Sequence, residues 1–280
     1  MKLGISGAVY SRLKEKRYQY MKEDGYSYCD LGLQNTDHPM YHCSEEELAV
    51  LMANEKKLAE DAGIEYYQVH GPWRYPPKDA TPEDREERKE KMRRSMLAAK
   101  LLGAKYVVFH PIYPFGVTGM VEPELVFQMN VEYFRDLIPA AKAYGVGIAL
   151  ENMPHPEFPL AAPEMTLKLV EALDDPVVQI CLDTGHSAVM GVQPADAVRL
   201  LGSRVKVLHV HDFNACGDHR IPYTGTVDWE DFAAALNETN FSGVFSIETR
   251  APNAKLSDAP WLAQNKATAL IARHIADMTE

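Results

Sequence analysis

Short apolar runs recur along this chain at regular intervals, and amphipathic helical stretches separate them. Several runs are apolar at successive positions, as in 106–109, which is typical of parallel strands covered on both faces. The stretches between them carry helix signals, because Ser44 with Glu47 forms a capping-box pattern and Gly103 follows a helical segment directly before a strand. The runs lie at 2–6, 28–33, 65–70, 105–110, 147–151, 178–183, 205–211 and 244–248.

This repeat decides the fold class. Eight β-then-α units in 280 residues give about 35 residues per unit, the size expected for a closed (β/α)8 barrel. A doubly wound sheet would show fewer units and a glycine-rich first turn, but residues 4–7 do not form GxGxxG and the chain has no Walker motif. The chain also has no linker and no shift in composition. The sequence therefore predicts an α/β fold, a single (β/α)8 TIM barrel domain spanning residues 1–280.

The charge balance restricts the partners. Lys and Arg number 29 and Asp and Glu number 40, so the formal net charge is −11, which argues against nucleic acid and anionic membranes. No apolar run reaches the roughly 18 residues of a membrane span, and the N-terminus has the pattern of a strand. The four cysteines have no pairing or metal-site spacing, as in reduced cytoplasmic proteins. We expect a cytoplasmic protein. The sequence does not decide whether the chain forms a homo-oligomer.

Polar residues at the ends of six consecutive strands are the main functional signal. Their separations are 26 to 41 residues, close to one unit each, and barrel strands deliver their C-terminal ends to one mouth. Taken singly, such a histidine is usually hydrogen-bonded in the core and such a glutamate caps a helix. Clustered without compensation they would cost several kcal/mol each, which a divalent cation would offset. The six residues are His70, His110, Glu151, Asp183, His209 and Glu248.

Mixed imidazole and carboxylate ligation suits several divalent cations. Mn²⁺ is our first choice, with Zn²⁺, Co²⁺ or Mg²⁺ as alternatives.

The motifs around these residues resemble those of the xylose isomerase-like barrel superfamily. That superfamily contains sugar and sugar-phosphate isomerases and epimerases together with the endonuclease IV proteins. The resemblance extends from His70 to Glu248, and the strand count carries it to both ends of the chain. As a set the motifs are specific for the superfamily and do not select a member. They are Val69-His70-Gly71-Pro72, Phe109-His110-Pro111, Leu150-Glu151-Asn152, Leu182-Asp183-Thr184-Gly185-His186, His209-Val210-His211-Asp212 and Ile247-Glu248-Thr249.

The resemblance implies a metal held by Glu151, Asp183, His209 and Glu248. His209 is favoured over His211 because the superfamily pattern His-x-x-Asp/Glu fits residues 209–212. A further group is implied to bind substrate or additional metal ions. It comprises His70, His110, His186, His211, His219, Trp73 and Arg250.

The implied reaction is sugar isomerisation or epimerisation, a role in carbohydrate metabolism. A proton would move next to a carbonyl through a metal-stabilised enediolate, with Glu151 and Glu248 as the acid/base pair. Trp73 and Tyr75 follow a strand end, where aromatic faces could stack on a sugar ring. Arg250 could bind an anionic group, but the chain has no dedicated phosphate loop. We therefore expect a non-phosphorylated sugar or polyol derivative.

Alternative activities stay open on the same residues. Ala215 stands where the ketose epimerases carry arginine, which argues against free ketohexose 3-epimerisation. A keto-sugar or inosose dehydratase or lyase would use related enolate chemistry. An endonuclease IV-like trinuclear zinc phosphodiesterase is opposed by the net charge and by Gly217 at an expected Asp position. A non-catalytic ligand-binding barrel is opposed by the complete set of ligand-type residues.

Overall fold

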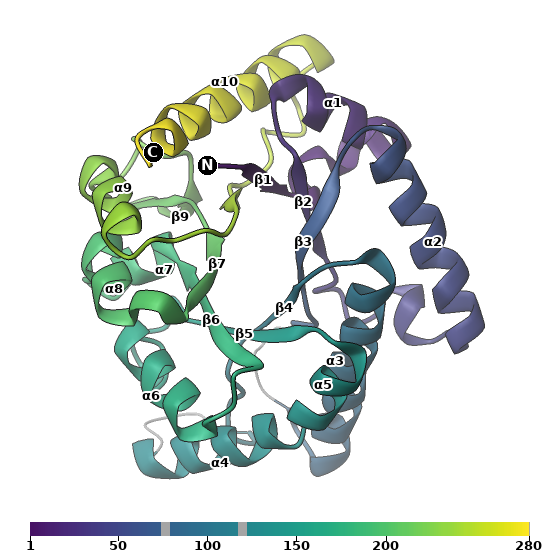
Figure 1. Ribbon diagram of the computed structural model, residues 1–280, viewed down its shortest axis with the longest axis vertical. Coiled ribbons are helices and arrows are strands. Elements are labelled where there is room, and N and C mark those ends of the chain that lie inside the picture. Colours follow the sequence, from purple (N-terminus) through teal and green to yellow (C-terminus); the bar gives the residue numbers. More distant parts are fainter. Residues whose placement is uncertain (74–78, 117–121, 280) are drawn as a thin grey trace.

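Eight parallel strands form a ring with helices around its outside (Figure 1). The computed structural model describes residues 1–73, 79–116 and 122–279. The ring closes where Val210 N–H donates to the Ser246 carbonyl at 2.8 Å and the Val210 carbonyl accepts from Glu248 N–H at 3.0 Å. In ring order the strands are β10 (Phe245–Ile247), β1 (Leu3–Ser6), β2 (Tyr28–Gly32), β3 (Glu65–His70), β4 (Tyr106–Phe109), β5 (Gly147–Glu151), β6 (Val178–Asp183) and β7 (Val205–His209).

All eight predicted runs lie on these strands, so the predicted (β/α)8 TIM barrel is confirmed. Four of the predicted runs extend one or two residues beyond the C-terminal ends of their strands: 28–33, 105–110, 205–211 and 244–248. His110 and Glu248 lie one residue beyond their strands, and His211 lies two residues beyond β7. These three side chains therefore sit in the loops of the barrel mouth.

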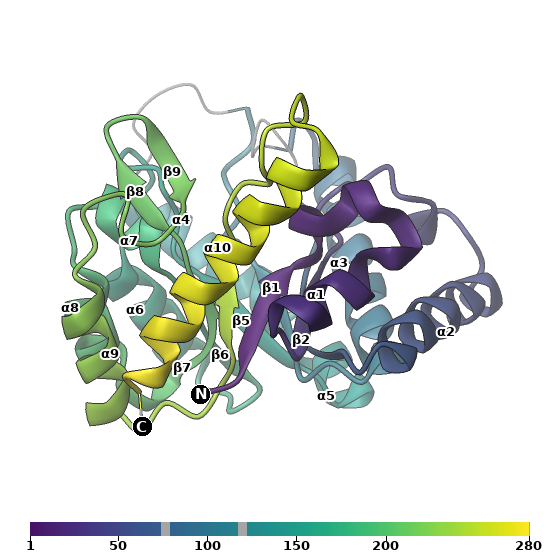
Figure 2. The ribbon, with the colours of Figure 1, turned by 90° about the horizontal axis from the view of Figure 1, so that it is seen from above.

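Helices connect successive strands and cover the outside of the ring (Figure 2). The predicted capping box is present, because Ser44 Oγ accepts from Glu47 N–H at 3.2 Å and Glu47 Oε2 accepts from Ser44 N–H at 2.8 Å. Gly103 ends its helix in the left-handed region, at φ +81°. No helix within the described ranges is long and apolar enough to cross a membrane. The α-helices are α1 (Arg17–Asp24), α2 (Glu45–Asp61), α3 (Pro82–Leu102), α4 (Pro123–Arg135), α5 (Ile138–Tyr144), α6 (Pro163–Leu173), α7 (Thr184–Val189), α8 (Pro194–Leu201), α9 (Trp229–Glu238) and α10 (Asp258–Asp277), and the 3₁₀ helices are η1 (Gly7–Lys16), η2 (Pro39–Tyr41) and η3 (Gly202–Arg204).

The barrel has two separate apolar regions. The larger one lies between the strands and the helices, and the smaller one lies inside the ring. The inner cluster consists of Val108, Ala149, Cys181 and Val207, all fully buried. Because side chains two residues apart share a face of a strand, the next inward position after each of these carries a polar side chain at the mouth. Those polar residues are His110, Glu151, Asp183 and His209, so the inner cluster forms the floor of the site.

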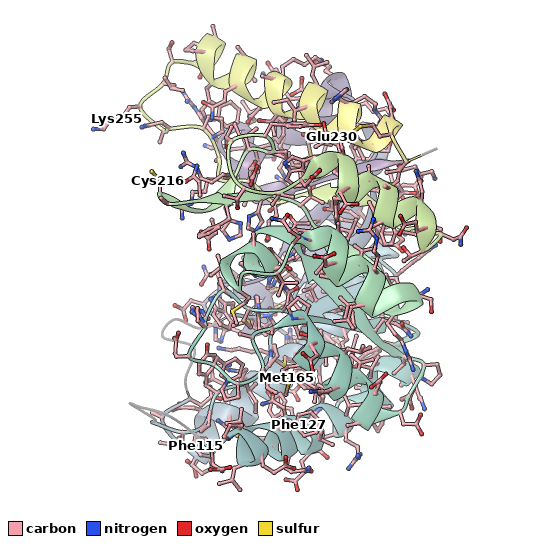
Figure 3. All side chains as sticks on the ribbon, turned by 90° about the vertical axis from the view of Figure 1, so that its left-hand side faces the viewer. Phe115, Phe127, Met165, Cys216, Glu230 and Lys255 are labelled. Atoms are coloured by element: carbon pink, nitrogen blue, oxygen red, sulfur yellow. The ribbon has the colours of Figure 1, made fainter. Side chains whose placement is uncertain are left out.

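A short antiparallel hairpin stands above the strand ends at one side of the mouth (Figure 2). It consists of β8 (Asp212–Asn214) and β9 (Gly217–Arg220), which lie outside the eight predicted runs. Its base is fixed by the Asp212 carboxylate, which accepts from Gly225 N–H at 2.9 Å and from the Trp229 indole at 3.2 Å. Figure 3 shows Cys216 at the exposed tip.

The outer core can be tested with Leu182→Ala. Leu182 is fully buried on β6, so we expect the variant to lose about 2–5 kcal/mol of unfolding free energy through lost burial and a cavity. Leu125→Ala is the matched control, because Leu125 is 68% exposed and should change stability by no more than about 0.5 kcal/mol. Urea unfolding followed by circular dichroism measures both. Equal losses in the two variants would contradict the assignment of Leu182 to the core.

Candidate active site

Four acidic and imidazole side chains meet at the mouth of the barrel. One donor atom from each of Glu151, Asp183, His209 and Glu248 lies within 4.8 Å of the others. His209 Nδ1 is 3.0 Å from Glu151 Oε1 and 3.3 Å from Glu248 Oε2. Strands β5, β6 and β7 supply the first three, and Glu248 follows β10. We call these four residues the donor ring.

The donor ring fits a divalent cation. Glu151, Asp183 and His209 are almost completely buried, so three carboxylates crowd one imidazole where water is scarce. Glu151 Oε2 is buried and makes no hydrogen bond to the described residues. A buried carboxylate oxygen without a partner is costly, and a cation coordinated by oxygen and imidazole nitrogen would compensate it.

Burial and neighbouring charge separate the pKa values within the donor ring. Burial raises the pKa of the Glu248 carboxyl to about 8, and the charge of Glu151 adds to this. Burial raises the pKa of Glu151 too, but the surrounding histidines outweigh it and hold that pKa well below its usual value. Burial opposes protonation of His209, yet the neighbouring Cys181 and carboxylates keep its pKa well above the usual value. Without a cation, these shifts favour the protonated forms of His209 and Glu248 over that of Glu151.

Asp30 on β2 is a site residue that the sequence analysis missed. Its Oδ2 lies 2.9 Å from His209 Nε2, on the edge of the imidazole that faces away from Glu151. Asp30 is 3% exposed. The signal that could have revealed it is an acidic residue in the middle of an apolar strand. Asp30 does not end its strand, so a search of strand ends passes over it.

His70 and His110 form one wall beside the donor ring. Their Nε2 atoms are 3.1 Å apart, and each lies about 3.5 Å or less from Glu151 Oε2. The indole of Trp73 packs against the His110 ring, with centroids 4.5 Å apart. The opposite ring nitrogen of His110, Nδ1, faces the sulfur of Met153 at 2.7 Å.

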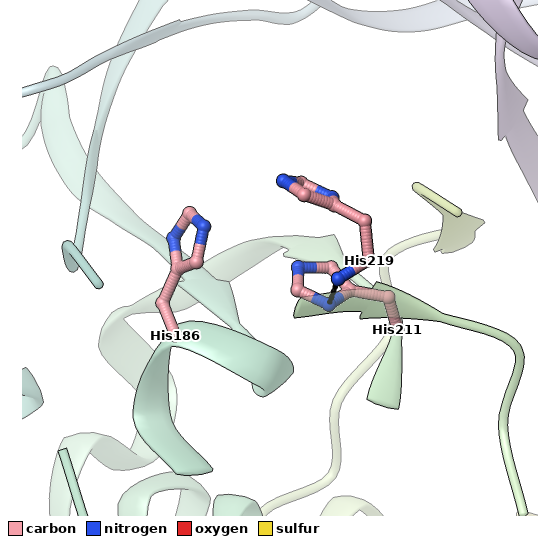
Figure 4. A group of neighbouring side chains, drawn as sticks. All are labelled: His186, His211 and His219. Carbon is pink, nitrogen blue, oxygen red and sulfur yellow. Dashed lines mark hydrogen bonds between the residues drawn. The ribbon is translucent and has the colours of Figure 1, made fainter. Parts of the chain in front are cut away.

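His186, His211 and His219 form the other wall (Figure 4). His211 accepts from His219 N–H at 2.9 Å through Nδ1, so its Nε2 donates to Asp183 Oδ2 at 2.8 Å. Both nitrogens of His211 are thus engaged in holding neighbouring groups. The Nδ1 atoms of His186 and His219 contact the carbonyls of Asn152, at 3.0 Å, and of Glu248, at 2.8 Å.

A cavity of about 260 Å³ opens between the two walls. Trp73 lines the cavity, whereas Arg250 does not and instead pairs with Asp218 at 3.1 Å, its side chain 64% exposed. The predicted aromatic contact Tyr75 lies outside the described residues. Five of the lining residues were not predicted from the sequence: Gln34, Met153, Pro154, His155 and Asp218. The lining consists of Gln34, His70, Trp73, His110, Glu151, Met153, Pro154, His155, His186, Asp218, His219 and Glu248.

Comparison with known families agrees with this architecture. The family described as xylose isomerase-like TIM barrel matches residues 18–272, nearly the whole chain. The chain belongs to this family.

Curated relatives match part of the chain. An inosose isomerase of Bacillus subtilis (strain 168) is 29% identical over 164 residues, which cover 56% of this chain and 58% of that protein. A D-psicose 3-epimerase of Ruminiclostridium cellulolyticum is 24% identical over 137 residues, which cover 49% of this chain and 45% of that protein. The matches thus span less than two thirds of these relatives.

Solved structures match the chain over its full length. D-psicose 3-epimerase with D-tagatose from Clostridium cellulolyticum H10 has a TM-score of 0.80 at 18% identity, covering 99% of both chains. An IolI protein solved with a bound zinc atom has a TM-score of 0.73 at 20% identity, covering 100% of this chain and 98% of the other. At these identities the likeness shows the fold.

The contact between His211 and Asp183 can be tested with Gly185→Ala. A Cβ at Gly185 would lie 2.1 Å from the His211 ring, so the ring must move and its bond to Asp183 weakens. We expect a loss of about 1–3 kcal/mol in urea unfolding. In the control variant Gly185→Ala/His211→Ala the clash is gone, and its stability should be close to that of His211→Ala alone. Strictly additive losses would contradict the clash.

Proposed function

We propose that this chain is a divalent-metal-dependent isomerase or epimerase of a small, uncharged sugar or polyol-derived ketone. The observation that carries the proposal is the buried donor ring at the edge of a cavity. Similarity to an inosose isomerase and to D-psicose 3-epimerases supports the same class of reaction.

Glu151, Asp183, His209 and Glu248 would hold the cation, with Mn²⁺ as the first choice. When bound, the cation would polarise the substrate carbonyl and stabilise the negative charge that forms when a neighbouring C–H proton leaves. Glu151 and Glu248 face the centre of the donor ring from strands three places apart, so they would remove and return that proton. Exchange between two faces of one carbon gives epimerisation, and transfer between two carbons gives isomerisation.

The lining of the cavity supports a neutral substrate. Among its described residues there is no lysine or arginine to bind a phosphate, and Arg250 is engaged by Asp218. Gln34, His155 and Asp218 offer hydrogen-bond partners for hydroxyl groups. The volume of about 260 Å³ lies just under the usual range of small-molecule sites, which begins at roughly 300 Å³. A sugar-sized polyol fits these properties.

Proton exchange in D₂O tests the proposal. With Mn²⁺ and a panel of keto-sugars and inososes, NMR should show deuterium entering one carbon next to a carbonyl. Glu151→Gln and Glu248→Gln should each slow this exchange by about 10²- to 10⁴-fold, because each removes a proton-transfer group. Glu132→Gln is the control, since Glu132 is an exposed acid on α4 that belongs neither to the donor ring nor to the lining of the cavity.

The outcomes of this experiment are distinct. No exchange on any member of the panel contradicts the proposal, as does full activity of Glu151→Gln. Exchange accompanied by loss of water would assign a dehydratase or lyase instead. Three tightly bound ions per chain with cleavage of abasic DNA would assign a phosphodiesterase.

Metal affinity should rise with pH. Protons on Glu248, whose pKa is raised to about 8, and on His209, whose pKa is raised above its usual value, must leave before these groups coordinate a metal. The apparent Mn²⁺ affinity should therefore increase by up to about tenfold per pH unit for each displaced proton, and level off above both pKa values. Titrations at several pH values, followed by EPR of free Mn²⁺, measure this. An affinity that is constant from about pH 6 to 8 contradicts it.

A further inference from the structure

We propose that Asp30 is a positioning residue for metal binding, because it fixes the proton on His209 Nε2 and leaves Nδ1 directed into the donor ring. The inference rests on the proposed metal site and adds to it a residue outside the donor ring. Asp30 Oδ2 is 2.9 Å from His209 Nε2, and the opposite nitrogen, Nδ1, is the one that approaches Glu151 and Glu248.

The chemistry of imidazole makes this contact decisive. A neutral imidazole carries a hydrogen on one nitrogen and a lone pair on the other, and only the lone pair can bind a metal. A carboxylate accepts and cannot donate, so Asp30 requires the hydrogen to be on Nε2. The lone pair then resides on Nδ1, at the centre of the donor ring. Without Asp30, the tautomer with hydrogen on Nδ1 would compete and could not coordinate.

Asp30 is itself held in place from a third strand. Gln68 on β3 donates its side-chain N–H to Asp30 Oδ2 at 2.9 Å and also lies 3.3 Å from the carbonyl of Leu208, the residue before His209. The position of the carboxylate is thereby tied to the backbone of β7. The imidazole of His70 stacks on that of His209, with ring centroids 5.5 Å apart and 13° between the planes. This stacking limits rotation of the His209 ring.

The contact with Asp30 also affects how strongly His209 would bind a metal ion. Asp30 is 3% exposed and its Oδ1 has no hydrogen-bond partner among the described residues, so its charge is poorly solvated and acts strongly on His209. A buried carboxylate hydrogen-bonded to a coordinating histidine raises the basicity of the imidazole and strengthens its bond to the metal. Asp30 would therefore contribute both the orientation and the electron donation of His209.

Two substitutions separate these contributions. Asp30→Ala removes the acceptor and the charge, and it should weaken Mn²⁺ binding by about 10- to 100-fold. Asp30→Asn removes the charge, but an amide oxygen in the place of Oδ2 can still accept from both His209 and Gln68, so its loss should be smaller. Titration of each full-length variant with Mn²⁺ alone, followed by EPR of the free ion, gives the dissociation constants without any substrate.

A matched control separates positioning from general destabilisation. Glu55 on α2 accepts from Arg17 and Tyr18 outside the barrel, so Glu55→Gln should lower the melting temperature while leaving the Mn²⁺ dissociation constant unchanged. A second readout follows the proton itself. In the Zn²⁺-loaded, ¹⁵N-histidine-labelled protein, the His209 Nε2–H should give a downfield proton signal that Asp30→Ala abolishes or shifts and Glu55→Gln retains.

The results distinguish the inference from the proposed function. If the wild-type chain binds no Mn²⁺, the proposed metal site fails, and the inference fails with it. If the wild-type chain binds Mn²⁺ and Asp30→Ala binds it equally well, the inference alone is overturned. It is overturned also if Glu55→Gln loses as much affinity as Asp30→Ala. A selective loss in Asp30→Ala, with a smaller one in Asp30→Asn, supports it.

Discussion

The arrangement of side chains at the mouth of this barrel depends on charge compensation in a poorly hydrated space. Three carboxylates and an imidazole converge there, and mutual repulsion would expel them or neutralise them with protons if nothing opposed it. The surrounding protein meets this requirement in part. His70 and His110 face Glu151. His211 donates to Asp183. Asp30 accepts from His209. These contacts leave the inward-facing atoms of the donor ring free for a cation.

The barrel geometry explains why the donors meet. Parallel strands end on the same side, and the alternating side-chain direction places three of the donors, Glu151, Asp183 and His209, two residues beyond a small or medium apolar residue of the inner cluster. Val108, Ala149, Cys181 and Val207 fill the interior directly beneath and keep water out from below. The register between strands then sets the spacing, since Asp183 lies beside His209 and Glu151 lies beside Cys181.

The sequence predicted the fold, and it placed the four donor residues among six candidates at strand ends, because both depend on local patterns. The family resemblance then implied that these four hold a metal. Apolar runs, helix caps and the residue that ends each strand are properties of neighbouring positions. The roles of Asp30 and Gln68 depend instead on contacts across 179 and 140 residues of chain, which no local pattern encodes. The same reason applies to His211, whose nitrogens are engaged by Asp183 and by the backbone of the β8–β9 hairpin, which lies outside the predicted runs. Arg250 was expected at the substrate, but its exposed side chain turns to Asp218.

The hairpin formed by β8 and β9 is anchored at its base, where four N–H groups converge on Asp212, and along β9, where His219 contacts His211 and the Glu248 carbonyl. Its outer end, at Ala215 and Cys216, is exposed to solvent. Substitutions at the outer end of the hairpin can therefore change which substrates enter the mouth of the barrel without altering the donor ring. Natural variation among descendants of this chain should accordingly accumulate at the hairpin end, and new substrate preferences could arise there by a few substitutions without renewed selection of the scaffold.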